Sequence, residues 1–129
     1  MFTLNYTGMK FTPEDPFDQS YIDLYDTHME RPQSFGKAMG KMAAAHILHS
    51  FERSNYTLHK GESSWNIMEE DIKMHYYLLN FMDNALSELQ YATELQEYLP
   101  KWLKHKKDLV ITRKQVLEVM HTDLFACFQ

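Results

Sequence analysis

One segment decides the expected fold: SWNIMEEDIKMHYYLLNFMDNALSELQYATELQEYL, residues 64–99. It contains neither Gly nor Pro, and it lies between Gly61 and Pro100. Apolar side chains in its first half recur at intervals of three and four, which places them on one side of a helix. These residues are Trp65, Met68, Ile72, Tyr76 and Leu79. The pattern predicts a long helix with an apolar stripe.

The stripe changes side in the second half of the segment. The apolar residues there are Ala85, Leu89, Ala92, Leu95 and Leu99. Their centre lies roughly 130° around the helix from the first set. A straight helix of this length would span about 54 Å, whereas a domain of this size has a radius of gyration of about 14 Å. Two interpretations remain: a kink or break near Asp83 and Asn84, or an unbroken helix that touches different neighbours along its length, including a second subunit.

The segments around this helix predict further helices. In chain order we expect a hairpin or extended arm (1–16), an acidic helix (17–30), a helix (34–53), the long or kinked helix (64–99), a basic connection (101–111) and a C-terminal helix (112–128). Pro100 should end the long helix, and Thr112 with Gln115 has the spacing of a capping box. The expected fold is all-α, a helical bundle of four to six helices in a single domain, residues 1–129.

Composition favours one globular domain in a reducing compartment. Of the 129 residues, 44% are hydrophobic and 24% are charged, close to the globular average. The single cysteine, Cys127, cannot form an internal disulfide, and the N-terminus lacks the pattern of a signal peptide. No apolar run approaches the ~20 residues of a membrane span. We therefore expect a cytoplasmic protein that does not enter a membrane.

Charge is unevenly distributed along the chain. Residues 1–30 hold six acidic residues against one lysine, and residues 101–114 hold six basic residues against one aspartate. The basic segment offers an alternative function, nucleic-acid binding, in which lysines meet phosphates while an indole stacks on a base. The residues for that role are Lys101, Trp102, Lys104, Lys106, Lys107, Arg113 and Lys114. The net charge of −5 argues against it, because nucleic-acid-binding domains are usually basic overall.

Histidines suggest a second alternative, a metal site inside the bundle. His46 and His75 fall on apolar helix faces, and His49 lies one turn from His46. Inward imidazoles of this kind can share a metal ion. Neutral core histidines satisfied by hydrogen bonds are the competing interpretation.

Catalytic signatures are absent from the sequence. It has no nucleophile elbow, and its four glycines form no phosphate-binding loop. Nine Met, eight Tyr and eight Phe are side chains that suit protein interfaces. We therefore expect a small non-enzymatic protein-interaction module without a cofactor, an adaptor or inhibitor that binds a larger protein through helical surfaces. The expected contact residues are Asp18, Asp23, Asp26, Tyr91 and Tyr98, and a homodimer is a further expectation.

Overall fold

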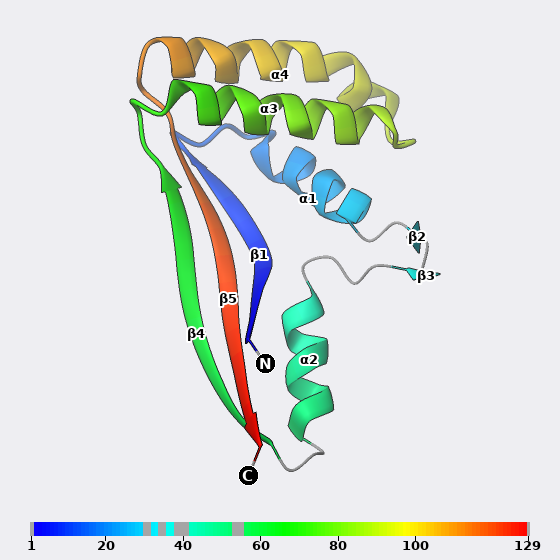
Figure 1. Cartoon of the computed structure of the whole chain (residues 1–129). Coiled ribbons are helices and arrows are strands. Elements are labelled where there is room, and N and C mark those ends of the chain that lie inside the picture. Colours follow the sequence, from blue (N-terminus) through cyan, green and yellow to red (C-terminus); the bar gives the residue numbers. More distant parts are fainter. Residues whose placement is uncertain (1, 30–31, 34–35, 38–41, 53–55, 129) are drawn as a thin grey trace.

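The computed structural model describes residues 2–29, 32–33, 36–37, 42–52 and 56–128, and it has an α+β fold (Figure 1). The elements are β1 (Phe2–Thr12), α1 (Asp18–Met29), β2 (Pro32–Gln33), β3 (Gly36–Lys37), α2 (Ala43–Glu52), β4 (Tyr56–Ile67), α3 (Ile72–Ser87), α4 (Thr93–Ile111) and β5 (Val116–Phe128). Three long antiparallel strands form one sheet in the order β1-β5-β4. The expectation of an all-α helical bundle is therefore wrong.

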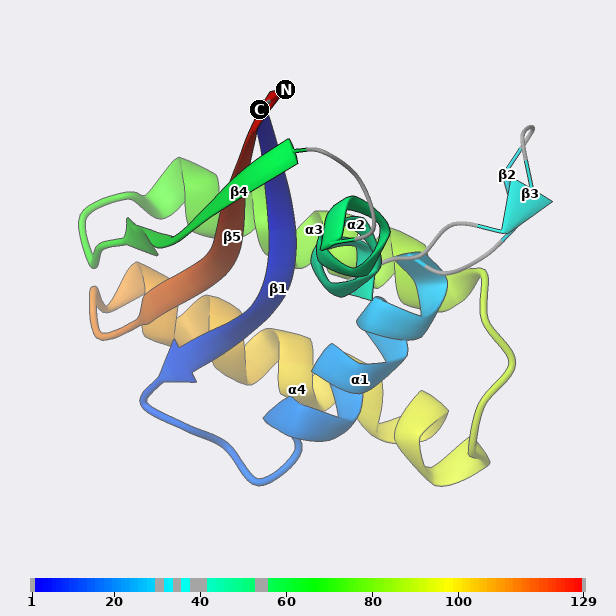
Figure 2. The same cartoon turned by 90° about the horizontal axis from the view of Figure 1, so that it is seen from below.

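The C-terminal segment, expected to be a helix over 112–128, is the central strand β5. It pairs with β1 on one side and β4 on the other, as Figure 2 shows from below. Thr112 ends α4 instead of starting a new helix. The misreading has a physical cause: both faces of β5 carry buried side chains, such as Leu117 and Leu124, and an apolar run of this kind fits either a helix or a buried strand.

The segment 64–99 is not one helix. Its first residues belong to β4, which ends at Ile67, and two helices follow, α3 and α4, separated at residues 88–92. The interpretation with a break is thus the one that the structure shows, a few residues beyond Asp83 and Asn84. Pro100 lies inside α4, so the expected basic connection at 101–111 is helical. Buried side chains lie on one side of α4 both before and after Pro100. Their packing outweighs the ~3 kcal/mol that an interior proline costs.

In the N-terminal half of the chain, the expected elements agree more closely with those of the structure. The acidic helix expected over 17–30 is α1. In the expected arm at 1–16, the described residues 2–16 contain one extended strand, β1, and no hairpin. Of the helix expected over 34–53, α2 covers Ala43–Glu52, whereas Gly36–Lys37 is a strand paired with Pro32–Gln33. Residues 34–35, 38–41 and 53 lie outside the described residues.

One face of the sheet carries the core. Phe11, Leu117 and Ile67 lie side by side across β1, β5 and β4, and helices α1, α3 and α4 pack on this face (Figure 1). At this end of the sheet the opposite face bears polar residues, including Lys10, Glu118 and Asn66 in the same register. Helix α2 contacts all three strands near the other end of the sheet. None of the described helices combines the length and apolar character that crossing a bilayer requires.

Candidate binding groove

A groove of about 490 Å³ lies between β4 and α3. Its lining is almost entirely apolar and consists of Trp65, Ile67, Asp71, Met74, Tyr77, Leu78 and Val119. Ligand sites in proteins typically enclose roughly 300–1,000 Å³ and are mostly apolar. The groove therefore has the size and the chemistry of a binding site.

Helix α3 forms one wall because it is apolar on two sides. Its inner side is buried in the core and consists of His75, Leu79, Met82 and Leu86. On the outer side Met74, Tyr77 and Phe81 recur at intervals of three and four, so they form a second stripe. Their side chains are 50%, 63% and 49% exposed. The rings of Tyr77 and Phe81 stack at a centroid distance of 6.2 Å, which makes the stripe continuous.

Strand β4 forms the other wall. Trp65 and Ile67 point to the core face of the sheet, because they lie directly opposite Val119 and Leu117 of β5. Ile67 is buried, whereas Trp65 is 56% exposed. The Trp65 ring packs against His121 with centroids 4.4 Å apart. Since β4 is an edge strand, no further strand of the described sheet covers this indole.

The polar end of the groove is acidic. Asp71 precedes α3, and its Oδ2 atom accepts a hydrogen bond from the backbone N–H of Met68 at 3.2 Å. Glu70 beside it is exposed. Because Asp71 is also exposed, a positively charged group in the groove would meet a carboxylate at this end.

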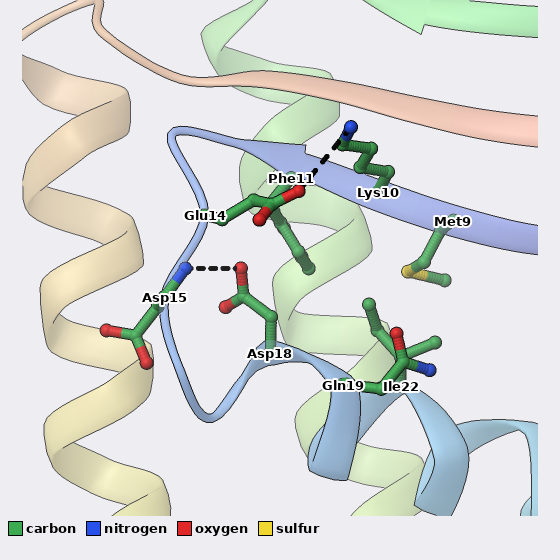
Figure 3. Close-up of a pocket in the computed structure, with 8 residues that line it drawn as sticks. All are labelled: Met9, Lys10, Phe11, Glu14, Asp15, Asp18, Gln19 and Ile22. Carbon is green, nitrogen blue, oxygen red and sulfur yellow. Dashed lines mark hydrogen bonds and ion pairs between the residues drawn. The ribbon is translucent and has the colours of Figure 1, made fainter.

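A second, smaller cavity of about 130 Å³ lies at the start of α1 (Figure 3). The carboxylate of Asp18 points into it and accepts a 2.8 Å hydrogen bond from the backbone N–H of Asp15. Asp18 also accepts a 2.9 Å bond from the Trp102 indole and lies 2.7 Å from the Lys106 ammonium. This carboxylate therefore joins α1 to α4. We assign the cavity a structural role, since it is smaller than ordinary ligand sites.

The five expected contact residues do not form one surface. Asp18 and Asp26 are buried, and Asp26 accepts a 2.8 Å hydrogen bond from the Tyr6 hydroxyl. Asp23 is exposed, whereas Tyr91 and Tyr98 are half-buried. Only Asp23 among these three carboxylates is open to a partner.

The basic segment is divided between surface and interior. Trp102 and Lys106 are fully buried, so neither the indole nor this ammonium reaches the surface. Lys107 is half-buried, and the exposed residues are Lys101, Lys104, Arg113 and Lys114. Lys104 pairs with Asp108 at 3.0 Å. The stacking side chain that the nucleic-acid interpretation needs is thus part of the core.

The three histidines of the metal interpretation are in different surroundings. His46 and His49 are exposed on α2. His75 is fully buried: its Nε2–H donates to the carbonyl of Met68 at 2.9 Å, and its Nδ1 accepts from the Gln115 amide at 3.3 Å. Both ring nitrogens of His75 are therefore already used. Within the described part of the chain, no three His, Cys, Asp or Glu side chains gather as a metal site would need.

The groove residues were not among the expected contact residues. Helical spacing predicted an inward position for Trp65, because residues 64–67 carry little local signal of a strand. A usable signal was present in Met74, Tyr77 and Phe81, which repeat with helical spacing on the side of α3 away from Leu79. Two apolar stripes on one helix indicate that one of them lies outside the core.

No protein-family model, curated protein or solved structure matches this chain. Function is therefore inferred from the geometry and chemistry of the groove itself. Its exposed aromatic and Met side chains and its acidic end are the features to be explained.

Proposed function

We propose that this chain is a non-enzymatic protein-interaction module, an adaptor or inhibitor that holds a segment of a larger protein in the groove between β4 and α3. The observation that carries the proposal is the cluster of exposed Trp65, Met74 and Tyr77 around a concave apolar surface. The segment bound there is amphipathic: its apolar side chains fill the groove, and a Lys or Arg approaches Asp71.

The residue types support a protein partner. Trp, Tyr and Met are enriched at protein interfaces, and Trp and Tyr are common among the residues that dominate binding energy. Each large aromatic side chain can bury roughly 150–250 Å². Trp65 and Tyr77 are both more than half exposed, so a partner would remove much apolar area from water.

The shape of the surface favours a linear segment over a small apolar molecule. The outer stripe of α3 continues past the groove to Phe81, which does not line it. From Met74 to Phe81 the helix rises about 10 Å. An amphipathic helix or strand can cover the groove and this extension together, whereas a small molecule would cover the groove alone.

Charge supports a basic residue in the partner. The polar member of the groove lining is Asp71, and Glu70 is exposed beside it. The whole chain carries a net charge of −5. A basic residue next to the apolar anchors would therefore be attracted at long range and paired at Asp71.

The proposal includes a cytoplasmic location. The only cysteine, Cys127, is a free thiol, and proteins of reducing compartments keep their thiols in this state.

A displayed library of short random peptides, selected on the immobilised full chain, tests this function. We expect selected peptides with two or three large apolar residues and a Lys or Arg. The Trp65→Ala and Tyr77→Ala variants should each bind such a peptide at least about tenfold more weakly, as loss of a central anchor implies. Asp71→Asn should reduce binding of the basic peptide and leave a peptide with Gln at the basic position unaffected.

Glu97→Ala on α4 is the matched control, because Glu97 is exposed and does not line the groove. Each variant is first compared with the unaltered chain by circular dichroism and thermal melting. Unchanged peptide affinity in folded Trp65→Ala and Tyr77→Ala would overturn the proposal. So would selection of peptides without apolar anchors.

A further inference from the structure

Strand β4 has an open edge. The strand order β1-β5-β4 places it at one side of the sheet, and among the described strands it pairs with β5 alone (Figures 1 and 2). It is 12 residues long, and His59, Lys60, Gly61 and Glu62 in its middle are all exposed. Alternate residues of an edge strand direct their N–H and C=O groups away from the sheet, so β4 offers roughly six residues for pairing with another strand.

Two of the usual protections of an edge, a proline and a bulge, are missing from β4. It contains no proline, and its pairing with β5 runs from Tyr56 to Ile67 without a bulge. The other edge strand, β1, does have an irregularity, a register shift between Tyr6 and Gly8. Bulges discourage pairing with further strands, because they distort the edge. The two edges therefore differ in their readiness to accept a partner strand.

We propose that β4 pairs antiparallel with β4 of a second copy of this chain, across a two-fold axis at Gly61. In this register Lys60 lies directly opposite the partner's Glu62, and symmetry repeats the pair. Both side chains are exposed, and both point to the face of the sheet that carries Asn66 and Glu118, since residues two apart point the same way. Opposite charges directly across an antiparallel pair are stabilising.

The charges also disfavour the two neighbouring registers. In an antiparallel pair, two directly opposite residues are either both hydrogen-bonded or both not. In a symmetric pairing of β4 with itself, the two-fold axis therefore passes beside a residue that lies opposite its own copy. The registers next to the one at Gly61 have this axis at Lys60 or at Glu62. An axis at Lys60 would place this ammonium opposite the partner's Lys60. An axis at Glu62 would place two carboxylates opposite each other. Like charges in these positions are destabilising, so the register at Gly61 is the favoured one.

The resulting dimer has a continuous sheet in the order β1-β5-β4-β4-β5-β1, formed from the three strands of each copy. Its two-fold axis is perpendicular to the sheet, so the two core faces lie on the same side. Trp65 stands four residues beyond Gly61, and the two grooves are therefore separated along the strand direction by about eight residues, or roughly 26 Å. Self-pairing goes beyond the proposed function and does not depend on it.

Charge reversal tests the pairing while leaving the fold in place. Sedimentation equilibrium of the full chain should show a concentration-dependent dimer. We expect Lys60→Glu and Glu62→Lys each to reduce dimerisation at least tenfold. An equal mixture of the two variants, and the double variant Lys60→Glu/Glu62→Lys, should restore it, because both arrangements again place opposite charges across the axis. Recovery of this kind cannot result from misfolded chains.

Cysteine cross-linking tests the register. Gly61 suits the substitution, because a Cβ added there meets nothing within 4 Å. In a Cys127→Ser background, Gly61→Cys should form a disulfide-linked dimer under mild oxidation, since directly opposite Cα atoms lie about 4.5–5.5 Å apart. Ser63→Cys is the matched control, because it would face the partner's His59. A strictly monomeric chain, a dimer insensitive to both charge reversals, or preferential cross-linking of Ser63→Cys would overturn the proposal. None of these results bears on peptide binding in the groove.

Discussion

The two tryptophans of this chain occupy opposite kinds of surroundings. Trp102 of α4 is fully buried, with its ring 5.7 Å from Phe11 and 4.7 Å from Tyr21, and its N–H donates to Asp18. Trp65 of β4 is 56% exposed and lines the groove. The comparison shows that position relative to the sheet decides what an aromatic side chain does. Trp102 lies between the sheet and α1, whereas Trp65 lies at an edge.

The largest expected difference is in stability. Trp102→Ala should lower the free energy of unfolding by about 3–5 kcal/mol, because it leaves a large cavity and removes a hydrogen-bond donor from buried Asp18. Trp65→Ala should cost less than about 1 kcal/mol, as for other surface changes. Urea denaturation followed by circular dichroism measures both. Equal losses in the two variants would mean that Trp65 also belongs to the stabilising core.

The next effect concerns the ion pair beside Trp102. Lys106 and Asp18 are both buried and lie 2.7 Å apart, so Lys106→Met leaves a buried carboxylate without its counter-charge. We expect a loss of roughly 3 kcal/mol in unfolding free energy. The double variant Lys106→Met/Asp18→Asn should lose less unfolding free energy than the two single variants lose in sum. Additive losses in urea denaturation would contradict coupling between these side chains.

Lys104→Met is the control for this experiment. Lys104 also forms an ion pair, with Asp108 at 3.0 Å, but both side chains are exposed. Its removal should change the unfolding free energy by less than about 0.5 kcal/mol. Contrast between the two lysines thus extends the contrast between the two tryptophans to charged side chains.

The third effect is a pH dependence of stability in alkaline solution, and it concerns Tyr21, whose ring lies 4.7 Å from that of Trp102. Burial, and secondarily the neighbouring Tyr91, Tyr98 and Asp15, raise the pKa of Tyr21 from 10.0 to about 12. The folded state therefore retains the proton that the unfolded state loses. The corresponding stability is fully present below pH 10 and is lost as the pH rises toward 12. Burial and Asp26 also raise the pKa of Tyr6.

Tyr21→Phe separates this ionisation from the other contacts. The Tyr21 hydroxyl donates to the carbonyl of Leu95 at 2.7 Å, so the variant loses some stability even at neutral pH. Above pH 10 its unfolding free energy should fall less steeply with pH than that of the unaltered chain. Urea denaturation at several alkaline pH values gives the two slopes. Identical slopes would show that Tyr21 does not contribute to alkaline unfolding.

Sequence patterns predicted the local elements and missed the ones that depend on distant partners. The acidic helix α1 and the interruption between α3 and α4 follow from residues close together in the chain. Strand β4 includes Lys60, Gly61, Glu62 and two serines, a polar composition that resembles a loop. It is a strand because it pairs with β5, at least 50 residues later. Such pairing leaves little trace in the local sequence.

The candidate site was missed for the same reason. Without β4, Trp65 was assigned to the inner side of a helix, and Trp102 was assigned to an exposed basic segment. Pro100 contributed to the second error, since an interior proline normally ends a helix. The packing of Leu99, Leu103 and Val110 along α4 carries the helix through it.

The central position of β5 has a consequence for how the molecule is made. This strand follows β1 and β4 in the chain and forms the only link between them in the described sheet. During synthesis, β1 and β4 are therefore made before the strand that pairs with both of them, and the sheet cannot form until residues 116–128 have left the ribosome. In that interval neither strand has its partner in the sheet, and unpaired strand edges are prone to aggregate.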